Sequence, residues 1–156
     1  MINEISIRTA QISDAEEISN MVVENARVFL RKHYSEEQWS VFLSYYSVEV
    51  VVQKIQSQAF FCAVFQGIIV GIIALDYDYV VGLYTNINYV NKGIGGKMLQ
   101  FIEHFAKKKG FNTIQLASSP VGLEFYCKHG WQKVEELQVL YYEVGFVETI
   151  MIKHLY

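Results

Sequence analysis

Three glycines in the segment Tyr84–Leu99 (YTNINYVNKGIGGKML) could hold a ligand that carries phosphate groups. Gly93, Gly95 and Gly96 lack a Cβ atom, so a ligand can come close to the backbone there. The residues after them predict a helix, whose first N–H groups have no partner and whose positive dipole end faces the same turn. Turns of this kind, between a strand and a helix, bind phosphate groups. The segment therefore predicts a site for a cofactor with a pyrophosphate.

Two other glycine-rich motifs match the same segment incompletely. A Walker A loop, G-x-x-x-x-G-K-[ST], would need glycine at Asn91 and Ser or Thr at Met98. A dinucleotide-binding turn, G-x-G-x-x-G, would need glycine at Met98 and would follow a first strand, whereas this turn lies in the middle of the chain. A nucleotide-binding α/β protein stays as one alternative.

Residues 90–95, VNKGIG, resemble the acetyl-CoA loop of the GCN5-related N-acetyltransferases, [QR]-x-x-G-x-[GA], at every position except the first. Leu83 to Gly95 also aligns without a gap to L-Y-V-x-P-x-Y-Q-G-K-G-I-G, a sequence typical of many members. Val90 stands where the family has Gln or Arg, so only its amide can serve there. Asn91 replaces a common glycine, and asparagine tolerates left-handed backbone geometry better than most residues.

A second stretch, residues 119–131 (SPVGLEFYCKHGW), resembles another pattern of the same family, N-P-x-x-x-x-x-Y-x-K-x-G-[FW], with Ser119 in place of asparagine. The two patterns occur in the family's order, and the resemblance covers nearly the whole chain. It implies acetyl-CoA as co-substrate and no metal. The cofactor contacts that it implies come from Leu83, Thr85, Val90, Asn91, Lys92, Gly93, Ile94, Gly95, Gly96, Lys97, Ser119, Phe125 and Lys128.

The chemistry that the resemblance implies is direct transfer of the acetyl group to an amine. Tyr126 matches the family tyrosine that protonates the departing thiolate. Because an unperturbed tyrosine has a pKa of about 10 and a thiol about 8.5, full transfer is uphill by roughly 2 kcal/mol, and a strong hydrogen bond can serve instead. Backbone groups from Leu83 to Thr85 would pair with the pantetheine arm, and an N–H near Thr85 would polarise the thioester carbonyl.

The acceptor side is less defined. An amine with a pKa of about 10.4 arrives charged and must lose a proton before it attacks, often to a carboxylate or to ordered water. Asp76 and Asp78 lie between two expected strands, and of the two we favour Asp78 as the base. Further residues that would shape the acceptor pocket are His33, Tyr34, Trp39, Tyr45 and Tyr46. The acceptor stays open between a small molecule and a peptide or protein amine. Alternatives are a longer acyl chain, a different acceptor, or a catalytically silent CoA-binding sensor or interaction module.

The elements that must position these residues follow the family's order. Strands are expected over 5–8, 59–65, 68–75, 79–87, 111–116, 131–142 and 148–155, with Gly145 in the last connection. Capping patterns at Ser13–Glu16 and Ser35–Gln38 open two helices, residues 48–56 form a third, the glycine turn opens the central helix, and Ser119-Pro120 caps a short one. The expected fold is a three-layer α/β/α domain over residues 1–156, an α/β (α+β) class with a mixed, mostly antiparallel sheet splayed at the cofactor site.

Composition narrows the function classes. The chain has 156 residues, 52% of them hydrophobic and 15% aromatic, enough for one packed domain and a surplus that fits a homodimer. The formal net charge of −3 argues against a nucleic-acid partner. No apolar run reaches 18 residues, and the N-terminus lacks a signal-peptide pattern, so we expect no membrane segment. Cys62 and Cys127 are expected to be reduced thiols in a cytoplasmic protein.

Overall fold

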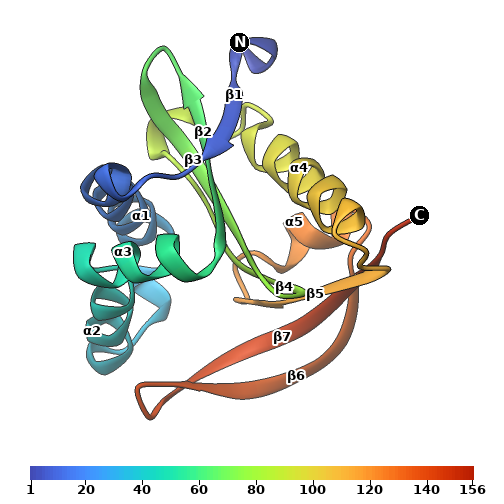
Figure 1. Cartoon of the computed structure of the whole chain (residues 1–156). Coiled ribbons are helices and arrows are strands. Elements are labelled where there is room, and N and C mark those ends of the chain that lie inside the picture. Colours follow the sequence, from blue (N-terminus) through green and yellow to red (C-terminus); the bar gives the residue numbers. More distant parts are fainter.

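One twisted sheet with helices on both faces forms the protein in a computed structural model that describes residues 1–156 (Figure 1). The strands are β1 (Ser6–Thr9), β2 (Ala59–Phe65), β3 (Ile68–Asp76), β4 (Tyr79–Thr85), β5 (Thr113–Ser118), β6 (Gln132–Tyr141) and β7 (Val144–His154). Their order in the sheet is β1-β2-β3-β4-β5-β7-β6. Every neighbouring pair is antiparallel except β4 and β5, so the predicted mixed, mostly antiparallel sheet is confirmed.

The helices form the two outer layers. They are α1 (Ala15–Phe29), α2 (Glu36–Tyr45), α3 (Val48–Ser57), α4 (Ile94–Lys108) and α5 (Leu123–Lys128), with short 3₁₀ turns η1 (Ile2–Glu4), η2 (Ile12–Asp14), η3 (Arg31–His33) and η4 (Ile87–Tyr89). Two buried apolar clusters result: α4 packs on one face of the sheet, and α1, α2 and α3 pack on the other. None of the helices is both long and apolar enough to cross a membrane.

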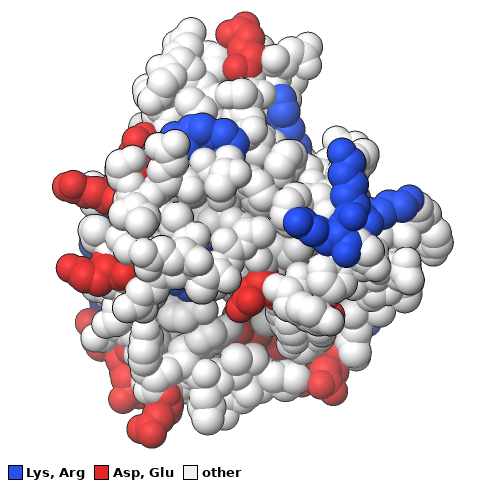
Figure 2. Space-filling model, in the orientation of Figure 1, with Lys and Arg blue, Asp and Glu red and all other residues white.

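Periodicity explains these layers. In α4 the buried residues Met98, Leu99, Ile102 and Ala106 recur at helical spacing and face the sheet. Strand β3 is buried along almost its whole length because helices cover both of its faces. Figure 2 shows a cluster of basic side chains over the C-terminal end of α4, where Lys107–Lys109 suit the negative end of the helix dipole.

Three local predictions need correction. The first long helix begins at Ala15 after η2, and the capping box joins Gln11 and Asp14 instead of starting at Ser13. Helix α5 begins at Leu123, because the Ser119 hydroxyl accepts the N–H of Gly122 in a preceding turn. Gly145 lies inside β7: the last hairpin turns at Tyr142 and Glu143, which both have positive φ, as a two-residue turn requires.

The sheet parts between β4 and β5. Only Tyr79–Gln115 and Val80–Leu116 are paired there, after which the two strands separate. β4 stays paired with β3 up to Thr85, and β5 stays paired with β7 along all its residues. A register shift in the β3–β4 ladder leaves Val81 between the paired residues Val80 and Gly82, at the point where the strands part. The predicted splay is therefore present.

Ile102 tests whether α4 holds this layer. We expect Ile102→Ala to lower the free energy of unfolding by about 2–4 kcal/mol, because it leaves a cavity at a fully buried position. His104→Ala, on the exposed side of the same helix, should cost less than about 0.5 kcal/mol. Urea unfolding followed by circular dichroism measures both, and equal losses would contradict this assignment of the helix faces.

Candidate functional site

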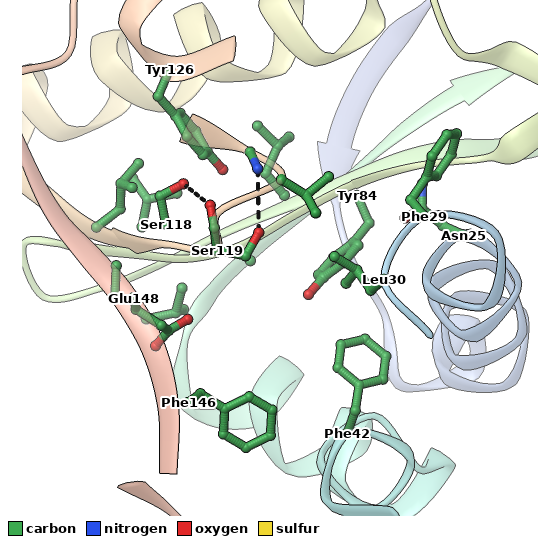
Figure 3. A pocket seen from close by; sticks show the side chains of 18 of the residues that line it. Asn25, Phe29, Leu30, Phe42, Tyr84, Ser118, Ser119, Tyr126, Phe146 and Glu148 are labelled. Carbon is green, nitrogen blue, oxygen red and sulfur yellow. Dashed lines mark hydrogen bonds between the residues drawn. The ribbon is translucent and has the colours of Figure 1, made fainter. Parts of the chain in front are cut away.

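A cavity of about 710 Å³ lies where β4 and β5 part (Figure 3). Its walls come from α1, α2, β4, the η4–α4 connection, α5 and the β6–β7 hairpin. Most of the lining side chains are apolar or aromatic. The cavity therefore joins the glycine turn to the region between α2 and β7.

The glycine turn forms one end of the site. Asn91 has φ 59° and Gly93 has φ 83°, and α4 begins directly after Gly93. The first helical bond in this turn runs from the N–H of Lys97 to the carbonyl of Gly93, so the amides before it lack a helical acceptor. Val90, Asn91 and Gly95 line the cavity. With the positive dipole end of a 15-residue helix, this turn can bind an anion.

Packing explains two of the glycines in the turn. A Cβ atom on Gly95 would lie 3.2 Å from Cζ of Phe125, and one on Gly96 would lie 2.9 Å from Nε2 of His129. The ring of His129 is fixed in turn, because its Nδ1 lies 2.9 Å from the carbonyl oxygen of Phe125. Both glycines therefore let α5 pack against the start of α4, which places Phe125 in the cavity wall.

The lysines of the turn differ in their surroundings. The ammonium of Lys97 donates to the carbonyls of Ile2 and Ile5, at 3.0 and 2.7 Å, and so ties α4 to the N-terminal segment. These two bonds occupy the Lys97 ammonium, which the sequence analysis expected to contact the cofactor. Lys92 is exposed, and Lys128 is exposed with Glu124 at 3.7 Å. Positive side chains that could still turn to an anion here are therefore Lys92 and Lys128, while Ile94 is buried in the core.

The inner edge of β4 presents main-chain groups to the opening. The N–H of Asn86 donates to the carbonyl of Val70 in β3. This bond shows that the main-chain groups of Asn86, and of every second residue before it, point toward β3. Because these groups alternate along an antiparallel strand, the N–H and C=O of Leu83 and Thr85 face the cavity. The carbonyl of Thr85 accepts a 2.7 Å bond from Asn25 Nδ2 of α1. An extended ligand could pair with the remaining groups.

Tyr126 lines the cavity from α5, across from β4. Its ring packs against Phe125 at 5.3 Å and Trp131 at 6.1 Å between centroids, and its hydroxyl points toward Ser119 in the cavity (Figure 3). Burial raises the pKa of Tyr126 well above its usual value near 10. The phenol therefore stays protonated at neutral pH and can donate a hydrogen bond.

Asp78 is absent from the cavity lining. Its carboxylate accepts a 3.0 Å bond from Nε2 of Gln115, and its carbonyl accepts the N–H of Gln115 at 2.9 Å. These bonds fasten the β3–β4 turn to β5 at the closed end of the opening. Asp78 thus has a structural role here, and the geometry does not support its expected role as a base.

A carboxylate that does line the cavity belongs to Glu148, which the sequence analysis did not identify. It projects from β7 into the cavity (Figure 3). Its Oε1 accepts a 2.7 Å bond from the hydroxyl of Tyr141. Burial raises its pKa, and the hydrogen bond from Tyr141 opposes that rise. An acidic residue within the apolar strand 144–152 (VGFVETIMI) was the signal that could have identified it.

Of the expected acceptor-side residues, the cavity brings together Tyr34, Tyr45 and Tyr46, whereas His33 and Trp39 are not in its wall. His33 borders a smaller adjoining cavity, which also touches Tyr34 and Glu148. Trp39 is buried and stacks on Phe42 at 5.7 Å. Ser119 and Phe125 also line the main cavity, next to Tyr126.

Comparisons with known proteins identify the fold. The acetyltransferase (GNAT) domain family matches residues 30–154. A GCN5-related N-acetyltransferase from Rhodopseudomonas palustris superimposes with a TM-score of 0.89 at 23% identity, covering 96% of this chain and 95% of its own. PaiA N-acetyltransferase from Thermoplasma acidophilum, solved with coenzyme A, gives 0.81 at 26% identity over 96% and 98%. YjaB from Escherichia coli gives 0.76 at 15% identity over 95% and 96%. A search of curated proteins found no match.

The effect of burial on the pKa of Glu148 can be tested through the pH dependence of stability. Since its pKa is raised on folding, the folded state binds the proton more tightly, and stability falls as pH rises from the unfolded pKa of about 4.3 through the raised value. Glu148→Gln removes the charge but keeps an acceptor for Tyr141. We expect a higher melting temperature than that of the wild type at pH 8, with a smaller gain at pH 4.5. The exposed Glu136→Gln should show no such pH-dependent gain.

Proposed function

Because the chain belongs to the GNAT acetyltransferase family, we propose that it transfers the acetyl group of acetyl-CoA directly to the primary amine of an acceptor. One observation carries the proposal: β4 and β5 part at a cavity that joins a turn with unpaired amides at the start of α4 to a half-buried tyrosine and a half-buried carboxylate. The PaiA N-acetyltransferase, which is 26% identical over nearly the whole chain, was solved with coenzyme A.

The cofactor end of the proposed site uses mostly main-chain groups. The amides from about Val90 to Gly96 would hold the pyrophosphate at the start of α4. The pantetheine arm would lie along β4, where the N–H and C=O of Leu83 and the N–H of Thr85 face the opening. Lys92 and Lys128 would add positive charge near the phosphates, and Ser119 and Phe125 would border the arm. Val90 contributes no polar side chain, which leaves this binding to the backbone.

The reaction end uses side chains. The neutral amine attacks the carbonyl carbon, the C–S bond breaks, and the thiolate leaves. Tyr126 would donate a hydrogen bond or its proton to that sulfur, and its raised pKa favours the hydrogen bond over complete transfer. A cavity-facing N–H of β4 would polarise the thioester carbonyl. Glu148, directly or through water, would receive the proton of the incoming ammonium group.

Thiol release tests the proposed function. The protein, acetyl-CoA and a panel of primary amines are mixed, and free thiol is followed with a colorimetric reagent. Acceptor-dependent release together with an acetylated product in mass spectrometry supports the transferase. Binding of CoA without release for any amine would favour the silent CoA-binding module instead, and tight binding of NAD or ATP without CoA would overturn both.

The proposal includes a cytoplasmic location. Cys62 is buried and Cys127 is exposed, and neither forms a disulfide, which is the usual state of thiols in a reducing compartment.

Tyr126→Phe tests the proton donor. Removing the hydroxyl should lower kcat by about 100-fold, within the range of a general acid, because the thiolate then leaves without a donor. The dissociation constant of CoA should change less than about threefold, because the ring and its contacts with Phe125 and Trp131 are kept. Steady-state kinetics and calorimetry measure the two quantities, and an unchanged kcat would remove Tyr126 from the mechanism.

Gly93→Ala tests the cofactor turn against a matched control. Gly93 and Gly67 have similar positive φ values, 83° and 77°, and a Cβ atom added to either would meet no neighbour closer than 3.7 Å. Both Gly→Ala variants should lose about 1 kcal/mol of stability through backbone strain. Only Gly93→Ala should weaken CoA binding, by about tenfold, because only this turn presents amides to the phosphates. Equal CoA affinities of the two variants in calorimetry would contradict the assigned site.

A further inference from the structure

The acceptor end of the cavity is enclosed by aromatic rings that contact one another in a closed circuit. We call this circuit the aromatic collar. Its members, in the order of contact, are Tyr34, Phe146, Tyr141, Tyr45, Tyr46 and Phe42. All six line the cavity, and they come from the η3–α2 segment and the β6–β7 hairpin. Figure 3 shows Phe42 and Phe146 on one side of the cavity and Glu148 beside them.

The collar is geometrically well ordered. Neighbouring ring centroids are 5.3–6.2 Å apart, and most pairs are edge-to-face or tilted, the arrangements that aromatic quadrupoles favour. Tyr84 of β4 extends it toward the inner edge of the sheet, at 5.2 Å from Tyr46. The bond from Gln38 Nε2 to the carbonyl of Gly145 fixes α2 against β7 and so holds the two halves together. Four of the six rings are tyrosines, so the wall combines a large area of aromatic ring surface with neutral hydroxyl groups.

Charge in this cavity is restricted to one group. Glu148 is the only acidic or basic side chain among the residues that line the cavity. A ligand with a single ammonium group can be neutralised there, whereas each further charge would be buried without a partner, which is strongly unfavourable. The lining therefore selects against polycations.

Lys54 affects where in the cavity a cationic group of an acceptor could lie. Its ammonium lies behind the collar, 3.4 Å from the centroid of Tyr45 and 4.9 Å from that of Tyr46, and burial lowers its pKa to about 8. A second cation is therefore disfavoured against these two rings. The ammonium group of an acceptor is directed away from them, to Glu148, on the same side of the cavity as Tyr126 (Figure 3).

We propose that the acceptor is a small primary monoamine with an aromatic body, of the arylalkylamine class, with its nitrogen at Glu148 and its ring in the aromatic collar. This inference rests on the proposed function. The step balances: the ammonium group gives one proton to Glu148, the amine nitrogen bonds to the acetyl carbon, and the C–S bond breaks. The nitrogen loses its second proton to solvent, and the sulfur takes one from solvent or from Tyr126, which solvent then reprotonates. Glu148 returns its proton to solvent, so that the products are an N-(arylalkyl)acetamide, the free CoA thiol and one released proton.

The test compares amines that differ in ring and in charge. Thiol release with acetyl-CoA gives kcat/KM for 2-phenylethylamine, n-propylamine, spermidine, kanamycin and the peptide Phe-Gly-Gly. We expect 2-phenylethylamine to exceed n-propylamine by at least about tenfold, from burial of the ring and its edge-to-face contacts, and to exceed both polycations. A higher kcat/KM for spermidine, kanamycin or the peptide, or less than about a threefold gain from the ring, would overturn the inference.

Two variants assign that preference to the collar and to Glu148. Phe146→Leu should reduce the ratio of kcat/KM for 2-phenylethylamine over n-propylamine by about threefold or more, while Phe101→Leu, outside the cavity, leaves it unchanged. Glu148→Gln should lower kcat/KM for the aromatic amine at least about tenfold, and the exposed Glu136→Gln should not. An unaltered ratio in Phe146→Leu, with CoA binding intact to show that it folds, contradicts the inference.

The same measurements separate the acceptor class from the proposed function. If spermidine or kanamycin is acetylated faster than 2-phenylethylamine, the enzyme is a transferase and only the acceptor class is wrong. If CoA does not bind and no amine releases thiol, the proposed function fails, and the acceptor class fails with it.

Discussion

The parting of β4 from β5 is the constraint on which the rest of the structure depends. Two residue pairs hold the strands together, and beyond them the inner edge of β4 has main-chain donors and acceptors without a neighbouring strand. A closed sheet would satisfy those groups internally, so the opening has to be maintained by other contacts. Helices on both faces, the pairing of β5 with β7 and the Gln115–Asp78 bonds at the closed end provide them. The opening is therefore maintained by the surrounding contacts, and an extended ligand with amide groups could pair with the free edge of β4.

The two ends of the opening have opposite electrostatic character. At the η4–α4 turn, unpaired amides and the helix dipole give a positive end that suits an anion. At the β7 side, Glu148 is the single acidic group within apolar and aromatic walls. Because the medium between the two ends is largely apolar, an electrostatic interaction at either end would be stronger than in water. This arrangement would suit the proposed pair of ligands, of which one is anionic and the other cationic.

The sequence allowed the element order and the glycine turn to be predicted because both depend on local signals. Ser35 and Gln38 form the expected capping box, α4 begins directly after Gly93 as the glycine turn predicts, and Asn91 adopts the left-handed geometry that asparagine tolerates. Errors arose where tertiary contacts decide. Nothing local shows that the Lys97 ammonium is held by carbonyls of residues 2 and 5, or that the last hairpin turns at Tyr142 and Glu143 without a glycine. That Glu148 lines the cavity and Asp78 does not is decided by the tertiary arrangement of β7, β4 and β5, which no local sequence pattern shows.

This difference follows from how each end of the site is made. Where the backbone supplies the donors, a turn needs only a particular geometry, so side chains such as Val90 can vary while the glycine pattern persists and can be identified in the sequence. Where side chains supply recognition, the residues come from separate elements: Phe42 lies in α2, Tyr84 in β4 and Glu148 in β7. Their spacing along the chain follows no fixed pattern, because it is set by how α2 packs against the hairpin. The proposed cofactor end can thus be identified from a motif, whereas the proposed acceptor end can be identified only from the walls of the cavity itself.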